Sequence, residues 1–156
     1  MRKIVFSLTG SILILLIIIA VTGYCKYKPK PSVLEVFVNN QSALVEAGTY
    51  SLEKWGREAA DDTYSDPVTL VRNDDPIVVG PSEEIMLEFE NSPQTVKYYL
   101  WDVKTGKLAY KGLKGYPLKL EDSNVESGDY AMEIRAKWEN GYVLYNTRII
   151  VYNDAK

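Results

Sequence analysis

Residues 129–151 read Asp-Tyr-Ala-Met-Glu-Ile-Arg-Ala-Lys-Trp-Glu-Asn-Gly-Tyr-Val-Leu-Tyr-Asn-Thr-Arg-Ile-Ile-Val, and this stretch decides the fold. Apolar and polar residues alternate on both sides of Asn140-Gly141, which is the pattern of half-buried strands. An Asn-Gly pair between two such runs favours a type I′ turn, because both central positions of that turn need a positive φ. We therefore predict an antiparallel hairpin with Asn140 and Gly141 at its turn.

The preceding residues continue the strand pattern at short spacing. Residues 95–103 are rich in β-branched and aromatic side chains, and Gly106 suits the left-handed position of a turn that leads back along 108–111. Further strands are predicted over residues 33–38, 49–55, 68–71, 84–90 and 116–120, with a loop over 59–66. A single helical turn fits only residues 51–60. Short strands joined by polar turns predict an all-β protein, namely an antiparallel β-sandwich.

Residues 126–130, Glu-Ser-Gly-Asp-Tyr, lie at the start of the predicted hairpin. They resemble the acid-x-Gly-x-Tyr signature that opens strand F of immunoglobulin-like domains. In that family the tyrosine hydroxyl bonds back to the preceding corner, so the resemblance implies a tyrosine corner at Tyr130, with Gly128 as a structural residue beside it. Met132 stands where antibody domains have a cysteine. The likeness therefore implies an immunoglobulin-like sandwich architecture and not membership of the antibody family.

Residues 4–25 carry no charge and include Ile-Leu-Ile-Leu-Leu-Ile-Ile-Ile-Ala-Val at 12–21. A run this apolar partitions from water into a bilayer, so it predicts one N-terminal transmembrane or signal helix. Residues 1–3 would form a short basic cytoplasmic end, and residues 26–32 an extended Lys/Pro stem. Residues 33–156 would then form a domain outside the cytoplasm.

Two other fates of this segment stay open. Val21 and Gly23 are the small residues that a signal peptidase requires, so cleavage after Gly23 would release a secreted protein. Cys25 could carry a lipid after cleavage, although Tyr24 before it is bulkier than such sites favour. We favour a retained single-pass anchor. Cys25 is the one cysteine of the chain, so no intrachain disulfide can form, a condition common among Gram-positive envelope proteins.

Charge and composition exclude several functions. The first 30 residues carry five basic residues and no acid, whereas the other 126 carry 13 basic and 21 acidic residues, a net charge of −8. Such an acidic domain disfavours nucleic acid as a partner. The chain has no histidine, which removes Ser-His and Cys-His nucleophile systems and most zinc sites. A carboxylate hydrolase remains conceivable and would need two converging acids. We predict a protein that is not an enzyme and needs no cofactor.

Two groups of residues are candidate binding sites. Asn73, Asp74 and Asp75, followed by proline, resemble the calcium-binding Asn-Asp-Asn-x-Pro element of cadherin linkers, but these residue types are also typical of turns, and we favour the turn. Aromatic side chains on predicted neighbouring strands could form a platform for sugar or peptide, although strand alternation would divide them between two faces. The platform candidates are Tyr99, Trp101, Trp138 and Tyr142.

Two functions follow from these observations. The first is a membrane-tethered, non-enzymatic β-sandwich that binds or supports another cell-envelope component, either a protein or a wall polymer. The alternative is a carbohydrate-binding module that acts on cell-wall or secreted polysaccharide. Rings aligned on one exposed face would favour the alternative, and scattered rings would count against it.

Overall fold

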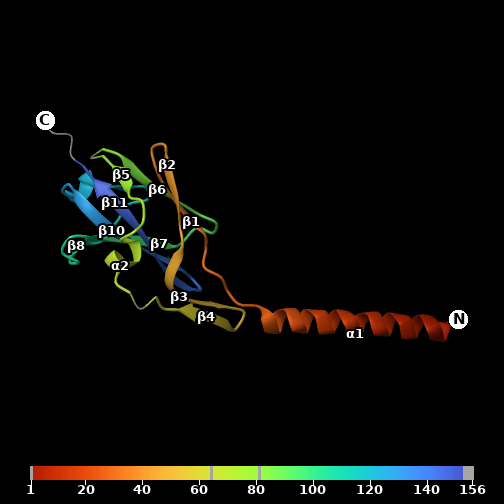
Figure 1. Cartoon of the computed structure of the whole chain (residues 1–156). Helices are drawn as coiled ribbons and strands as arrows, with labels where there is room; N and C mark the ends of the chain where they lie inside the picture. Colours follow the sequence, from red (N-terminus) through yellow and green to blue (C-terminus); the bar gives the residue numbers. More distant parts are fainter. Residues whose placement is uncertain (1, 64, 81, 153–156) are drawn as a thin grey trace.

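A single long helix projects from one end of a β domain in the computed structural model (Figure 1). The structure describes residues 2–63, 65–80 and 82–152, with side chains from residue 12 onward. The helix, α1 (Arg2–Lys26), contains the uncharged run of residues 4–25. Within the part of the chain whose side chains are described, no helix is both long enough and apolar enough to cross a bilayer. The membrane or signal role of residues 4–25 stays a prediction.

The domain is built from two sheets, as the strand pattern predicts. One has four strands in the order β2 (Gln41–Val45), β1 (Leu34–Val38), β6 (Glu84–Phe89) and β9 (Leu118–Lys119). The other has seven strands, with the order β4 (Arg57–Asp61), β3 (Ala47–Lys54), β11 (Gly141–Val151), β10 (Gly128–Trp138), β7 (Thr95–Asp102) and β8 (Leu108–Leu113). Its seventh strand, β5 (Ile77–Val79), pairs in parallel with β11, and the other described pairings are antiparallel.

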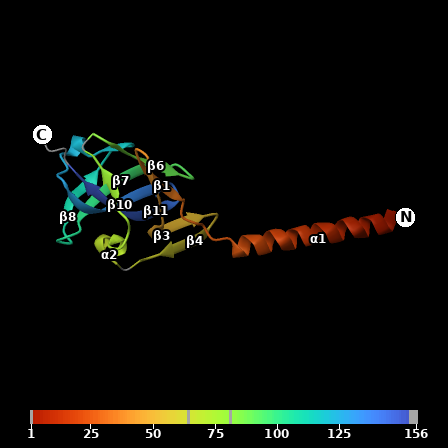
Figure 2. The ribbon, with the colours of Figure 1, turned by 45° about the horizontal axis from the view of Figure 1, so that its top comes forward.

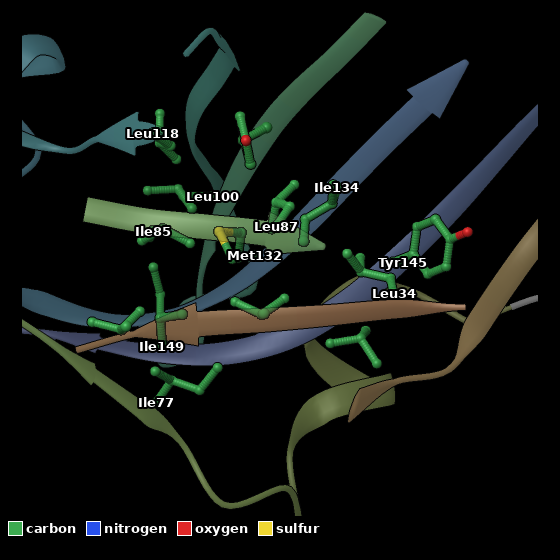
Figure 3. Close-up of a cluster of buried hydrophobic side chains, with 14 of the residues drawn as sticks. Leu34, Ile77, Ile85, Leu87, Leu100, Leu118, Met132, Ile134, Tyr145 and Ile149 are labelled. Atoms are coloured by element: carbon green, nitrogen blue, oxygen red, sulfur yellow. The ribbon is translucent and has the colours of Figure 1, made fainter. Parts of the chain in front are cut away.

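The core lies between the two sheets (Figure 3). Alternation along each strand sends every second side chain inward, so both sheets supply fully buried residues. These include Leu34 of β1, Ile85 of β6, Met132 and Ile134 of β10, and Tyr145 and Ile149 of β11. The described side chains thus confirm the predicted all-β sandwich, and its core forms without a disulfide.

Residues 129–151 form the predicted hairpin, β10–β11, but its turn is not the expected one. Trp138 pairs with Gly141, so Glu139 and Asn140 occupy the loop. Asn140 is not among the described residues with a positive φ, as a type I′ turn would require. Gly141 has a φ of 140°, and a Cβ on it would lie 2.0 Å from the carbonyl oxygen of Ser51 on β3. The predicted turn type was wrong: Gly141 lies at the first position of β11 and not in the loop, and both its positive φ and the close approach of β3 require glycine there.

A turn with the φ angles of type I′ lies instead between β3 and β4. Lys54 pairs with Arg57, and the two residues between them, Trp55 and Gly56, have φ angles of 54° and 69°. These are the two positive φ angles that a type I′ turn needs. Residues 51–60, the stretch in which the sequence allowed a helical turn, therefore belong to β3, this turn and β4. Tryptophan at the first turn position hid the hairpin signal.

Residues 68–71 form a helix and not the predicted strand. In α2 (Pro67–Val71) the side chain of Asp66 accepts a hydrogen bond from the Thr69 amide at 3.0 Å, and Pro67 supplies the fixed φ that suits a first turn. Val68 and Val71 fall on one side of this turn and pack against Ala131 of β10. This local capping overrides the β propensity of the valines.

The remaining elements agree with the sequence to different degrees. The strands predicted over 33–38, 49–55, 84–90, 95–103 and 108–111 are present with nearly the expected ends, and Gly106 has the expected positive φ of 69°. β4 occupies part of the loop predicted at 59–66, and β9 is shorter than the strand predicted at 116–120. The sequence patterns missed β2 and β5, and they also missed the short helix η1 (Glu121–Ser123).

Candidate functional site

The C-terminal end of α1 lies against the turn between β3 and β4, at the end of the domain from which the helix projects (Figure 2). The hydroxyl of Tyr24 donates a hydrogen bond to the carbonyl oxygen of Trp55 at 2.8 Å. The Arg57 guanidinium donates to the carbonyl oxygen of Cys25, which is one of the carbonyls that a helix end leaves without an internal partner. The rings of Tyr27 and Trp55 have centroids 5.0 Å apart. We call these five residues the junction.

The stem that follows α1 runs along the domain. Pro29 is buried, and the carbonyl oxygen of Ser32 accepts a 2.6 Å hydrogen bond from the hydroxyl of Tyr145. The amide of Asn91 donates to the hydroxyl of Ser32 at 3.1 Å. A cleft of about 370 Å³ separates the stem from the β10–β11 turn, with Trp138 in its lining. The helix is therefore joined to the domain by packed contacts as well as by the chain itself.

Tyr130 makes the hydrogen bond that the corner motif predicts. Its hydroxyl donates to the carbonyl oxygen of Glu126 at 3.1 Å. Gly128 lies beneath the ring, where a Cβ would approach the ring atoms of Tyr130 to 2.8 Å. Burial raises the pKa of Tyr130 to about 12, and the neighbouring hydroxyl of Tyr110 adds to the shift. These contacts give Tyr130 and Gly128 structural roles at the start of β10.

The four aromatic platform candidates do not form one row. Trp138 packs edge-on against the core ring of Phe89, with centroids 5.7 Å apart. Trp101 lies on the opposite face of the sheet, in the cluster that contains α2. Tyr99 is covered by the Arg135 guanidinium, 4.0 Å from its ring centroid, and Tyr142 alone of the four counts as exposed. This scatter counts against a carbohydrate platform.

Asn73, Asp74 and Asp75 lie in the turn after α2, where the amide of Asp74 donates to the carbonyl oxygen of Val71 at 3.1 Å. Among the described residues, no three histidine, cysteine, aspartate or glutamate side chains come together in a way that could hold a metal ion. The turn borders a cleft of about 690 Å³, whose other walls are the β2–β3 corner and Asn146 of β11. Glu46 joins Asp74 and Asp75 in this lining, so the cleft offers acceptor groups.

Sequence reasoning missed a charged cluster on the outer face of β10. Glu133 is only 5% exposed and accepts a hydrogen bond from Arg135, whose guanidinium lies over the ring of Tyr99. Strand alternation does place Glu133, Arg135 and Tyr99 on this face, but nothing in the pattern says that the face is covered there. The junction was missed as well. Trp55 and Arg57 would have been found only by recognising the β3–β4 hairpin.

Comparisons of the chain with protein-family models, with curated proteins and with solved structures found no match.

Proposed function

We propose that the chain is a membrane-tethered, extracytoplasmic β-sandwich protein without a catalytic role, which binds or supports another component of the cell envelope. The proposal of a membrane tether rests on the surface of α1. Consecutive large apolar side chains from Ile12 to Ile19 are each between 52% and 60% exposed, on all sides of the helix. A helix that is apolar all round is typical of a segment that lies in lipid or in protein.

We further propose that the domain is immunoglobulin-like. In such sandwiches strands C, F and G share one sheet and strands A, B and E the other. β7, β10 and β11 lie next to one another in one sheet, and β1, β6 and β9 in the other, which supports this assignment. The bond between Tyr130 and Glu126 at the start of β10 supports it independently. β3 and β4, added at the β11 edge, are departures from the common pattern.

The non-catalytic role is supported by the available chemistry. Without histidine, and with the single cysteine in α1, the chain lacks the usual nucleophile and base pairs. A binding or supporting role needs no reactive centre. It needs a rigid domain held in place, and the packed junction between α1 and the β3–β4 turn would provide this.

The tether is tested with the full chain expressed with its own N-terminus in a bacterial host. We expect it in the membrane fraction after alkaline carbonate extraction, with the domain open to protease added outside the cytoplasmic membrane. Mass spectrometry of the mature N-terminus distinguishes a retained anchor, cleavage after Gly23 and a lipid on Cys25. Recovery of the intact chain in the cytosolic fraction would contradict the proposal.

The binding role is tested by photo-cross-linking in intact cells. Leu44 and Tyr142 are exposed on different sheets, so a photoreactive residue at either position samples a different face. We expect a discrete adduct from at least one of the two faces. The absence of any adduct from both would contradict a binding role for these faces.

A further inference from the structure

Trp55 is not part of the core of the β domain, and its ring contacts Tyr27 of the stem, with centroids 5.0 Å apart. It occupies the first central position of the β3–β4 turn with a φ of 54°, and its side chain is 67% exposed. A bulky residue with positive φ is rare, and glycine or asparagine would form this turn at a lower conformational cost. A large ring kept in an unfavourable backbone conformation and in solvent points to a function outside the domain.

The junction fixes where Trp55 lies along α1. The hydroxyl of Tyr24 reaches the carbonyl oxygen of Trp55, and Arg57 reaches the carbonyl oxygen of Cys25. Tyr24 and Cys25 are the last residues of the uncharged run. With the uncharged run of α1 in the hydrocarbon layer of the proposed tether, these bonds place the β3–β4 turn beside the outer end of the run. That position is at the depth of the lipid headgroups.

The charges around the turn suit the same environment. The Nζ atom of Lys54 lies 5.0 Å from the ring centroid of Trp55, and the Arg57 guanidinium lies 5.8 Å from that of Tyr24. The adjoining end of α1 and its stem add Lys26, Lys28 and Lys30. The domain as a whole is acidic, and the exposed residues Glu53 and Glu58 form the next cross-strand pair of the hairpin. Strand alternation places these acids on the face opposite Lys54 and Arg57, so the basic residues are those beside the turn and the helix. Tryptophan and tyrosine concentrate at membrane interfaces, and lysine and arginine attract anionic headgroups.

We propose that the β3–β4 turn is a second membrane contact, with Trp55 in the headgroup layer of an anionic bilayer and Lys54 and Arg57 against the lipid phosphates. This inference rests on the proposed tether, because the position of Trp55 follows from that of α1. The contact would hold the domain in one orientation on the membrane. The partner is therefore the lipid surface itself and not a second protein.

The test uses the full chain reconstituted in vesicles of phosphatidylcholine and phosphatidylglycerol, with and without lipids brominated near the glycerol end of the acyl chain. Bromine quenches tryptophan emission at short range, so the quenched fraction reports which rings lie at that depth. The chain has three tryptophans, Trp55, Trp101 and Trp138. Trp101→Phe is the matched control, since Trp101 packs beside α2 and away from the junction.

We expect Trp55→Phe to lose most of the bromine quenching, and Trp101→Phe to raise the quenched fraction because it removes an unquenched emitter. Flotation of the vesicles in alkaline carbonate is measured on the same samples. If the chain floats and Trp55→Phe is quenched as strongly as the unmodified chain, the inference is wrong while the tether stands. If the chain does not float, the proposed tether fails and the inference fails with it.

Discussion

The hydroxyl of Tyr130 donates a 3.1 Å hydrogen bond to the carbonyl oxygen of Glu126, four residues earlier in the chain. The amide of Glu126 donates to a second hydroxyl, that of Tyr110, at 3.0 Å. The two rings meet edge to face with centroids 6.0 Å apart. Both backbone polar groups of residue 126 are thus bound by tyrosines, and the chain enters β10 through a corner with fixed geometry.

Replacing Tyr130 by phenylalanine should lower the free energy of unfolding by about 1 kcal/mol, because the carbonyl oxygen of Glu126 loses its partner while the ring packing is kept. Urea denaturation followed by circular dichroism measures this change. Tyr142→Phe is the control, since Tyr142 is exposed and its hydroxyl makes no hydrogen bond among those described. Equal stability of the two variants would mean that the corner bond contributes nothing.

Alkaline pH should destabilise the domain through its buried tyrosines. Burial raises the pKa of Tyr130 to about 12 and also raises the pKa values of Tyr98 and Tyr145. A tyrosine ionises near pH 10 in the unfolded chain, so the folded state keeps protons that the unfolded state loses. The contribution of these tyrosines to the free energy of unfolding should therefore be constant below about pH 10 and fall as the pH rises toward 12.

Urea denaturation at about pH 9 and about pH 11 checks this dependence on tyrosine ionisation. The Tyr130→Phe variant should lose less stability between the two pH values, since it has one buried hydroxyl fewer. Absorbance at the tyrosinate band should show a group of tyrosines that ionise only when the domain unfolds. A stability that does not change over this range would contradict the assignment of these hydroxyls as buried and protonated.

Gly141 should tolerate substitution far less than Gly106, although both have a positive φ. A Cβ at 141 would meet the carbonyl oxygen of Ser51 at 2.0 Å, whereas a Cβ at 106 would have no atom within 4 Å. Gly106→Ala should cost about 1 kcal/mol, from the left-handed conformation alone. Gly141→Ala should cost about 3 kcal/mol or more, because β3 and β11 must also separate. Thermal melts of the two variants measure the difference, and similar melting temperatures would contradict the role of Ser51.

The sequence predicts those parts of the fold in which one local signal acts alone. Alternation fixes β10 and β11, and the acid-x-Gly-x-Tyr segment predicts the bond between Tyr130 and Glu126. Prediction from the sequence fails where a tertiary contact determines the local structure. Gly141 looks like a turn residue, but it is a strand residue, and part of its requirement comes from Ser51, which is 90 positions away in the chain. In the same way, the valines of α2 look like a strand until the cap supplied by Asp66 is considered.

The candidate site was harder to predict than the fold. Aromatic residues could be assigned to strands, but the residues that contact them could not be predicted. The packing of Trp138 against Phe89 and the contact of the Arg135 guanidinium with the ring of Tyr99 were therefore not foreseen. The junction needs two segments about 30 residues apart, and no periodicity connects Tyr24 with Trp55. Sequence patterns report which face a side chain occupies but not what covers that face.

Arg148 should hold α2 against the sheet. Its guanidinium makes paired hydrogen bonds to the carboxylate of Asp129, at 2.9 and 2.7 Å, and a third to the carbonyl oxygen of Arg72 at the end of α2, at 3.1 Å. The bonds to Asp129 also hold the pKa of the guanidinium above its usual value. Arg148→Ala should therefore remove two links, whereas Asp129→Ala leaves the bond to Arg72 in place.

Hydrogen exchange separates these two variants. The amides of Leu70 and Asp74, which bond to the carbonyl oxygens of Asp66 and Val71, report the opening of α2 and its turn. Arg148→Ala should speed their exchange several-fold, whereas Asp129→Ala should change it little. A double-mutant cycle of the free energy of unfolding should give a coupling of about 1 kcal/mol between Arg148 and Asp129, because this pair is partly exposed. Equal exchange rates of these amides in both variants would mean that the bond from Arg148 does not hold α2. The packing of Val68 and Val71 against Ala131 would then be what attaches the helix to the sheet.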